Sequence, residues 1–240
     1  MAATSANPEG PAEDDGNPQR RAGRPPATVL DKDRITRAAL ELINLKGYSG
    51  LTMTALAKLL HVAPSALYNH VTAKRDVLVL LQEHLTAKVD VSKFGVAAWE
   101  EAVRTWAWSY RDVFAKHTPL IPVIAVLPVT DAPQTLAMYE KVSETLLHAG
   151  FPAERIISAI VALESFIFGS AYDATAPSDI FEPGTLADTN PHFTAVNSST
   201  HNHSPGRADT AFTLGLEALI SAFRSWQSTS GHRAPDEIVP

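Results

Sequence analysis

The chain has 240 residues, of which 45% are apolar, and it contains no cysteine. The length allows one large domain or a small domain with a larger one, and the lack of cysteine excludes disulfide scaffolds, thiolate zinc sites and cysteine nucleophiles. The net charge of −6 by itself argues against nucleic-acid binding, but the charge is uneven. Residues 16–78 carry a net +6, whereas residues 1–15 carry −4 and residues 79–240 carry −8. A basic segment on an acidic body is typical of a protein that binds the phosphates of nucleic acid with one end only.

The N-terminal residues 1–27 are rich in proline, glycine and charge and contain almost no large apolar side chains. Such a segment cannot bury enough surface to offset its chain entropy, so we expect a disordered arm. Within it, Arg20, Arg21 and Arg24 precede the first expected helix. An arginine-rich arm can lie in an A·T-rich minor groove, although a solvated linker with chance charge explains the same pattern.

The hydropathy pattern gives no sign of a membrane or secreted protein. No apolar run approaches the roughly 18 residues that span a bilayer, and the polar, acidic N-terminus has no apolar core of a secretion signal. We therefore expect a cytoplasmic protein without membrane association.

Helical periodicity begins after Asp31, which is a suitable N-cap. Apolar residues then recur with the spacing of one helical face. They are Ile35, Ala38, Ala39, Leu42 and Ile43. Gly47 ends this helix, Thr52 caps a second short helix and Pro64 opens a third. We expect Thr72 to cap a fourth, longer helix.

Three short helices with tight turns, placed at residues 28–78, match the plan of a helix-turn-helix DNA-binding domain. The third helix can bury Leu67 and Val71 while it presents polar groups outward. Its candidates for phosphate or base contacts are Ser65, Tyr68, Asn69 and His70. Lys74, which follows, suits a backbone phosphate. On pattern alone, a small helical cluster with solvated polar residues remains an alternative.

A more specific pattern covers residues 31–80. It consists of Ala39-Leu40-Glu41-Leu42, Gly47-Tyr48, Gly50-Leu51-Thr52-Met53, Leu56-Ala57, Val62, Leu67-Tyr68, His70-Val71, Lys74-Arg75 and Leu78. This pattern resembles the DNA-binding head of the tetracycline-repressor (TetR) family. The body resembles the tetracycline-repressor subgroup more weakly, chiefly at residues 212–217. The resemblance implies an all-helical homodimer that represses transcription and releases DNA when a small molecule binds.

By position, the resemblance places DNA contacts in and around the second and third helices, with one lysine on phosphate. The residues are Thr54, Pro64, Ser65, Tyr68, Asn69, His70 and Lys74. Two positions depart from the tetracycline repressors, which have a guanine-reading arginine in place of Thr54 and a tryptophan in place of Asn69. The operator sequence therefore does not transfer to this chain.

The body is expected at residues 79–228 and shows helical rather than strand periodicity. An aromatic stripe runs along residues 97–116, and Asp131 is expected to cap a helix that Pro133 opens. The polar residues 174–207 predict a long mobile loop. The fold class is thus all-α, with a helix-turn-helix domain followed by a helical ligand-binding and dimerisation domain.

Two further helices, at residues 152–172 and 208–226, are too apolar to be covered by one small body. We expect them to pack against their two-fold mates as a four-helix interface of a homodimer. Such a dimer places two heads one DNA turn apart, as a palindromic double-stranded operator requires. Residues 229–240 are expected to form a loose tail.

Aromatic and apolar residues at helical spacing indicate a cavity for a small-molecule effector in the body. The candidates are Trp106, Tyr110, Phe114, Ile124, Leu127, Glu164 and Phe168. Ordinary core packing explains the same spacing, and Glu164 could be solvent-facing or hydrogen-bonded within the fold.

Tetracycline repressors hold their drug partly through magnesium bound by an asparagine and a histidine, and the resemblance places Trp106 and Ile124 at these positions. Neither side chain can coordinate a hard cation, which prefers oxygen ligands. We therefore expect a mostly apolar, aromatic or polycyclic effector, without metal or other cofactor.

No catalytic constellation is visible, because the chain lacks a Gly-x-Ser-x-Gly elbow, a His-Glu-x-x-His pair and a phosphate-binding glycine loop. The histidines His192, His201 and His203 have no compact metal-ligand spacing. The predicted function is a ligand-responsive transcriptional regulator, most simply a repressor. The alternatives are a helical enzyme and a protein-binding module without DNA binding.

Overall fold

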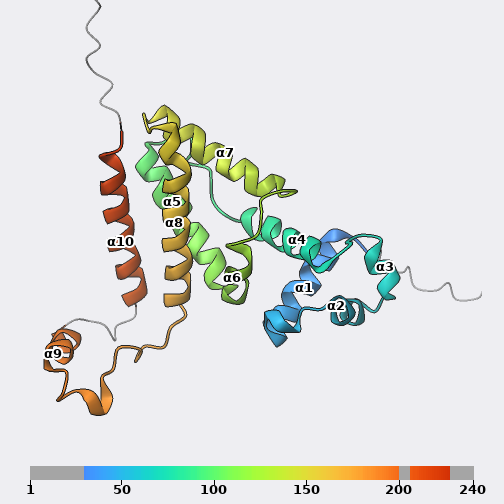
Figure 1. Cartoon of the computed structure of the whole chain (residues 1–240), viewed down its shortest axis with the longest axis horizontal. Coiled ribbons are helices and arrows are strands. Elements are labelled where there is room, and N and C mark those ends of the chain that lie inside the picture. The colour runs from blue at the N-terminus through green and yellow to red at the C-terminus, as the bar shows by residue number, and fades with distance from the viewer. Residues whose placement is uncertain (1–29, 200–205, 228–240) are drawn as a thin grey trace, which may run out of the picture. The chain divides into compact units, whose positions relative to one another are not determined.

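The computed structural model describes residues 30–199 and 206–227. Within these residues the chain forms ten α-helices and no strand, so the all-α prediction is confirmed (Figure 1). The first elements are α1 (Lys32–Lys46), η1 (Tyr48–Gly50), α2 (Met53–Leu60), α3 (Pro64–Tyr68) and α4 (Lys74–Thr86). The following elements are α5 (Trp99–Ala115), η2 (Thr118–Leu120), α6 (Ile121–Ile124), α7 (Pro133–His148), α8 (Ala153–Asp173), η3 (Gly184–Leu186), α9 (Pro191–Ser199) and α10 (Arg207–Arg224).

The first three helices of the head begin where local signals place them. The Asp31 carboxylate accepts a hydrogen bond from the Arg34 backbone N–H at 2.7 Å and so caps α1. The Thr52 hydroxyl caps α2 in the same way, 3.1 Å from the Ala55 nitrogen. Pro64 occupies the first turn of α3, where its missing N–H costs no hydrogen bond. Because α1 packs against α2 and α4, and α2 packs against α3, these helices form one cluster.

The start of α4 differs from the sequence expectation. Thr72 is not its N-cap, because that position belongs to Ala73, which has no side-chain oxygen. The Asp76 carboxylate instead accepts from the Thr72 N–H at 2.7 Å, the Thr72 hydroxyl at 2.6 Å and the Ala73 N–H at 3.3 Å. These bonds, the Thr72 hydroxyl bond most, lower the pKa of Asp76. The residue that caps α4, Asp76, therefore belongs to the first turn of the helix itself. The prediction that the polar residue just before the helix, Thr72, is the cap is wrong for this reason.

The body is built around α5 and α8, which pack along each other, with α7 and α10 also packed on α8 (Figure 1). Their largest fully buried side chains are Trp106, Phe114, Leu146 and Phe212. Among the described helices, α8 alone is long and apolar enough to cross a membrane by length and composition. Its contacts with α5, α7 and α10 are those of a core helix.

The approach of α10 to α8 is close at Gly215. The Phe166 ring of α8 lies where a side chain at position 215 would project, and it stacks on Phe212 with ring centroids 5.3 Å apart. Arg111 of α5, which is 2% exposed, lies over the Phe212 ring at 4.9 Å and pairs with Asp209 at 2.8 Å. Because Gly215 has no side chain, α10 can approach α8 closely enough for the Phe212 and Phe166 rings to stack, with Arg111 of α5 beside them.

The polar segment predicted as a loop at 174–207 contains two helical elements, η3 and α9, among its described residues. Pro191 opens α9, which is a favourable position for proline. Because the segment is polar, its residues show no clear helical periodicity from which to predict the short helix. The mobility of the segment stays a prediction. The boundary predicted after residue 78 falls inside α4. The arm at 1–27 and the tail at 229–240 lie outside the described residues.

The start of α7 corrects a second capping prediction. Asp131 is not the N-cap, because its φ is +67°, in the left-handed region, whereas an N-cap residue has extended backbone. The N-cap position is Ala132, which offers no side-chain bond. The Glu83 carboxylate of α4 accepts instead, from the Gln134 N–H at 2.7 Å and the Thr135 N–H at 3.0 Å. A residue from another helix thus caps α7.

Candidate functional site

The third helix presents the polar face that the sequence predicts. Leu67 is completely buried and Val71 is 2% exposed, so both anchor α3 and the turn after it. Thr54 is exposed on α2. The predicted contact residues on and after α3 are also exposed, and they are Pro64, Ser65, Tyr68, Asn69 and His70. This segment therefore offers hydroxyl, amide and imidazole groups that can reach phosphates or base edges.

Lys74, the predicted phosphate contact, lies against an aromatic ring. Its ammonium nitrogen is 4.0 Å from the centroid of the Tyr48 ring, which is within the range of a cation–π interaction. Tyr48 belongs to the short turn before α2, so it steadies a cation at the start of α4. Sequence reasoning included Tyr48 only in the family pattern and missed this contact.

Several predicted residues lie outside the described part of the chain. Of the three loop histidines, only His192 is described, and it is exposed on α9. Within the described residues, no three His, Asp or Glu side chains are grouped to hold a metal ion. The arginines of the arm lie outside the described residues, and they are Arg20, Arg21 and Arg24. The minor-groove arm therefore stays a prediction.

Four predicted effector residues form one buried group, which we call the aromatic cluster: Trp106, Tyr110, Phe114 and Phe168. The first three follow one face of α5, with ring centroids 5.5 Å apart from Trp106 to Tyr110 and 5.1 Å from Tyr110 to Phe114. Phe168 of α8 meets Tyr110 at 5.5 Å and Phe114 at 5.1 Å. The rings thus join α5 to α8 as one buried apolar layer.

The other two apolar candidates lie in the segment that precedes α7. Ile124 ends α6 and is buried, with 6% of its surface exposed. Leu127 is half-buried, three residues further along. Both can contribute apolar surface, but they add no ring contact to the aromatic cluster.

Glu164 joins the aromatic cluster through hydrogen bonds. Its Oε1 accepts from the Tyr110 hydroxyl at 3.0 Å and from the Tyr139 hydroxyl, on α7, at 2.7 Å. Burial raises the pKa of Glu164, although the two tyrosine bonds act in the opposite direction. Burial also raises the pKa of both tyrosines, so their hydroxyls stay protonated donors. Sequence reasoning left open that Glu164 is hydrogen-bonded, as it is here, and missed Tyr139.

One polar atom of the aromatic cluster has no partner among the described residues. The Nε1 of Trp106 is fully buried and donates no hydrogen bond. A buried donor without an acceptor costs roughly 1–3 kcal/mol, so such an atom is a natural place for a ligand or a water to supply the acceptor.

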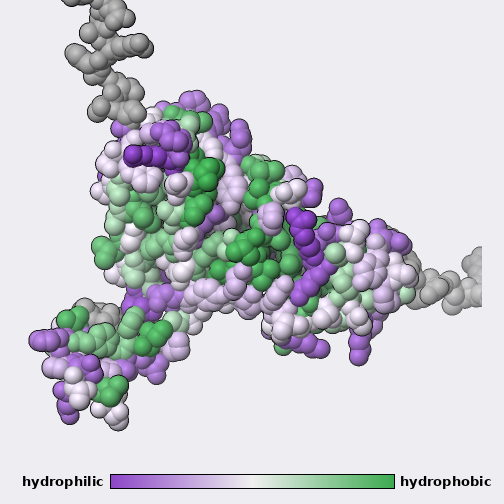
Figure 2. Space-filling model, in the orientation of Figure 1, coloured by the Kyte–Doolittle hydropathy of each residue, from purple (hydrophilic) through white to green (hydrophobic). Residues whose placement is uncertain are grey.

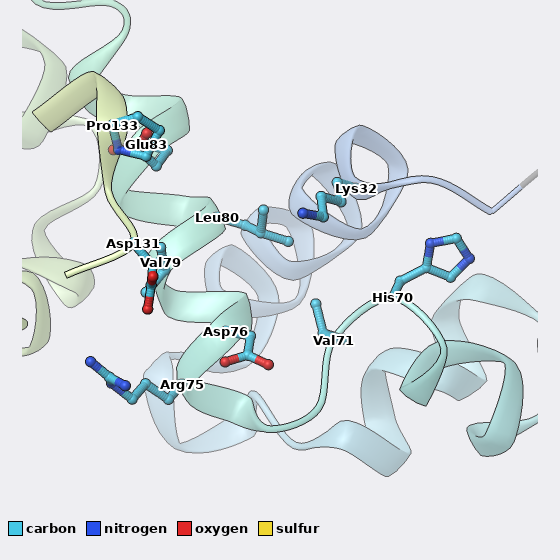
Figure 3. Close-up of a pocket in the computed structure, with 10 residues that line it drawn as sticks. All are labelled: Lys32, His70, Val71, Arg75, Asp76, Val79, Leu80, Glu83, Asp131 and Pro133. Atoms are coloured by element: carbon cyan, nitrogen blue, oxygen red, sulfur yellow. The ribbon is translucent and has the colours of Figure 1, made fainter. Parts of the chain in front are cut away.

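A cavity of about 420 Å³ lies between the head, α4 and the segment before α7 (Figure 3). Lys32, His70 and Arg75 line it from the head and the start of α4, and Asp131 lines it from the body. Glu83, which caps α7, also lines it. A predicted DNA contact and the cap of a body helix therefore line the same cavity.

The helices α8 and α10 also expose apolar side chains, although their other faces form the core. Ile157 and Val161, one turn apart on α8, are 66% and 54% exposed, and Leu214 on α10 is 74% exposed. Apolar patches reach the surface of the body in Figure 2. An apolar face on two packed helices is typical of a protein–protein interface.

Comparison with protein families identifies both halves of the chain. The model for the bacterial regulatory proteins of the tetR family matches residues 35–81, and the model for the tetracyclin repressor-like C-terminal domain matches residues 95–225. The chain belongs to the TetR family. The head and body of this TetR-family protein are therefore those of a DNA-binding transcriptional regulator with a ligand-binding C-terminal domain.

Individual relatives agree with this assignment. The tetracycline repressor protein class G of Vibrio anguillarum is 30% identical over 210 residues, which cover 82% of this chain and 94% of that protein. The transcriptional repressor DrrR1 of Streptomyces coeruleorubidus is 26% identical over 153 residues, which are 63% of this chain, and the match spans only 56% of DrrR1.

A solved structure shares the fold. The TetR family protein ActR of Streptomyces coelicolor, in complex with actinorhodin, matches with a TM-score of 0.70 and 24% identity. The match covers 85% of this chain and 100% of that chain. At 24% identity, this similarity shows only that the helices are arranged in the same way.

Proposed function

We propose that this TetR-family chain is a homodimeric repressor that binds a palindromic operator through α3 and releases it when an aromatic effector enters the body. The observation that carries the proposal is the exposed polar face of α3 on a head anchored by Leu67 and Val71. Relatives named as repressors or transcriptional regulators support repression rather than catalysis. A repressor acts where the DNA is, so we place the protein in the cytoplasm.

The effector site is assigned to the aromatic cluster, with Ile124 and Leu127 nearby. The rings of the cluster meet edge-to-face or tilted. Such rings favour an aromatic molecule that can pack against their faces and edges, and the unpaired Nε1 of Trp106 favours one with an oxygen acceptor. The class G relative is named for tetracycline, which is polycyclic. The rings contact one another here, so an effector must part them, and this displacement is the source of the signal.

The signal has a direct route to the head. The aromatic cluster joins α5 to α8, α8 packs on α7, and Glu83 ties α7 to α4. Because α4 begins at Lys74, next to α3, a shift of α7 alters the position of the recognition segment. The coupling is reciprocal, so DNA weakens effector binding by the factor by which the effector weakens DNA binding.

The dimer interface is assigned to the exposed apolar side chains of α8 and α10. These are Ile157, Val161 and Leu214. An isologous pair of these helices buries that face and relates the two heads by a two-fold axis. Sedimentation at micromolar concentration should then give a dimer. A monomer under these conditions would contradict the assignment.

Selection from a randomised duplex library, followed by anisotropy titration, tests the DNA half of the proposal. We expect a palindromic consensus with half-sites about 34–36 Å apart, and an affinity that falls steeply with salt because phosphates supply much of the binding. A helical enzyme or a protein-binding module would enrich no sequence. Failure to enrich any site with folded dimer would overturn the proposed function.

A further inference from the structure

The carboxylate of Glu164 is bonded to the described part of the chain through one oxygen. Both tyrosine hydroxyls that reach it, from Tyr110 and Tyr139, donate to the same oxygen, Oε1. For the other oxygen, Oε2, no partner is present among residues 30–199 and 206–227. One acceptor of a largely buried carboxylate is therefore free for a group from outside the chain.

Glu164 is accessible from solvent. Glu164 and Tyr139 are partly exposed, whereas Tyr110 is 3% exposed and Phe114 is completely buried. The carboxylate thus lies at the outer edge of the aromatic cluster, and the rings lie beneath it. A molecule that approaches the cluster from this side would meet Glu164 before the inner rings.

No positive charge compensates this carboxylate within the described part of the chain. Burial raises the pKa of Glu164, the tyrosines oppose that shift, and no lysine, arginine or histidine contributes to it. A carboxylate taken out of water without a counter-charge is costly. Three helices nevertheless bring polar groups to this point, α8 with Glu164, α5 with Tyr110 and α7 with Tyr139.

We propose that the effector carries a protonated amine on its aromatic body and that Glu164 binds this amine through Oε2. This inference rests on the proposed function, because it assumes that the effector occupies the aromatic cluster. Tyr110 and Tyr139 act as positioning residues that hold Oε1 and orient the carboxylate. The ammonium gains a charge-assisted hydrogen bond, and the neighbouring ring faces favour a cation. An anionic effector would be repelled.

Three fluorescent probes with one ring system test the charge preference: aminomethyl-anthracene, hydroxymethyl-anthracene and anthracene carboxylate. Binding is followed by probe fluorescence and by release of the selected operator duplex. We expect the amine to bind at least about tenfold more tightly than the alcohol, equivalent to about 1.4 kcal/mol, and the carboxylate to bind most weakly. The same order is expected for release of the operator.

Two variants assign the preference to one residue. Glu164→Gln keeps an oxygen that accepts from both tyrosines but removes the charge, so the ratio of amine to alcohol affinity should fall close to one. Glu140→Gln removes an exposed carboxylate from α7 and should leave the ratio unchanged. Circular dichroism checks that both variants are folded.

A pH titration of the unmodified protein needs no variant. Glu164 is ionised above its pKa, so affinity for the amine should fall as pH is lowered through that pKa, while affinity for the alcohol stays level. Tyr110 and Tyr139, the titratable groups that face Glu164 from α5 and α7, stay protonated throughout. A pH-independent amine affinity would overturn the inference.

The outcomes separate the inference from the proposed function. Equal affinities for amine and alcohol, or a preference that survives Glu164→Gln, overturn the inference and leave an aromatic effector site standing. If none of the probes binds or releases the operator, the aromatic cluster is not the effector site, and both statements fail.

Discussion

Glu83 caps α7 from another helix: its carboxylate accepts hydrogen bonds from both the backbone N–H and the hydroxyl of Thr135, each at 3.0 Å. The residue at the N-cap position of α7, Ala132, makes no such bond. Helix α4 therefore starts beside the recognition segment and, about two and a half turns later, holds the first turn of a body helix. The cap is part of the fold of α7 and, at the same time, part of the connection between head and body.

Replacing Glu83 with glutamine should weaken the coupling between effector and operator. The amide has one acceptor oxygen and no charge, so it cannot satisfy both the Gln134 N–H and the Thr135 pair, and loss of a cap costs about 1 kcal/mol. Operator affinity measured with and without aminomethyl-anthracene should differ less in this variant. Glu144→Gln, which removes an exposed carboxylate from α7 itself, is the control. An unchanged coupling factor would show that the signal takes another route.

The contact between Tyr48 and Lys74 makes a prediction about DNA affinity. Tyr48→Leu removes the ring under the ammonium, which is worth about 0.5–1 kcal/mol, so operator binding should weaken a few-fold without a change in base preference. Tyr48→Phe keeps the ring and should bind as the parent does. Lys74→Ala should flatten the salt dependence of log Kd by about one unit, because it removes one phosphate contact. A changed base preference with an intact salt slope would refute the phosphate assignment.

Asp76 makes the stability of the head depend on pH. Its pKa in the folded protein is lowered from an ordinary value of 3.8. A lowered folded-state pKa contributes stability above the unfolded-state pKa, and this contribution is lost as pH falls through the folded-state pKa. Asp76→Asn should therefore lower the melting temperature at neutral pH, by the equivalent of about 1 kcal/mol for a lost cap. The difference in melting temperature between Asp76→Asn and the parent protein should shrink as the pH falls below 3.8, the ordinary pKa of an aspartate. A difference independent of pH would mean that capping by the charged form contributes little.

The close approach at Gly215 predicts a steric effect. A methyl group there would overlap the Phe166 ring, which cannot swing away freely because it stacks on Phe212. Overpacking of this kind costs about 1–3 kcal/mol, so Gly215→Ala should lower the denaturation midpoint although alanine favours helices. Gly169→Ala on α8, where nothing lies within 4 Å, should not lower it. Equal midpoints for both variants would show that the ring adapts.

The apolar face of α8 and α10 predicts the effect of a charge. Val161→Lys places an ammonium at a position that is 54% exposed in the single chain but buried in the proposed dimer. Sedimentation should show a shift toward monomer, and operator affinity should fall with it because the two half-sites are no longer bound together. Val96→Lys, at a position 79% exposed before α5, should remain dimeric. A dimeric Val161→Lys variant would move the interface elsewhere.

The first three helices of the head and its exposed polar face were predictable from the sequence, because their signals are local. Asp31 and Thr52 each bond to a backbone N–H three residues ahead, and Pro64 fits a first turn by its own geometry. The burial of Leu67 and Val71 follows from helical periodicity. Such features depend on neighbours in the chain, so they can be read before the fold is known. The all-α class and the aromatic stripe of α5 follow from the same periodicity.

Only the tertiary structure decided which distant side chains meet. Glu83 caps a helix whose first bonded residue lies 51 positions away, and Glu164 meets Tyr139 across 25 positions. The cap predicted at Asp131 is wrong, because the path of the chain gives that residue a left-handed backbone and brings another carboxylate to the helix. Neither spacing nor composition specifies such pairs. They depend on how far each helix is shifted and turned against its neighbour, and the packing of the whole body sets those quantities.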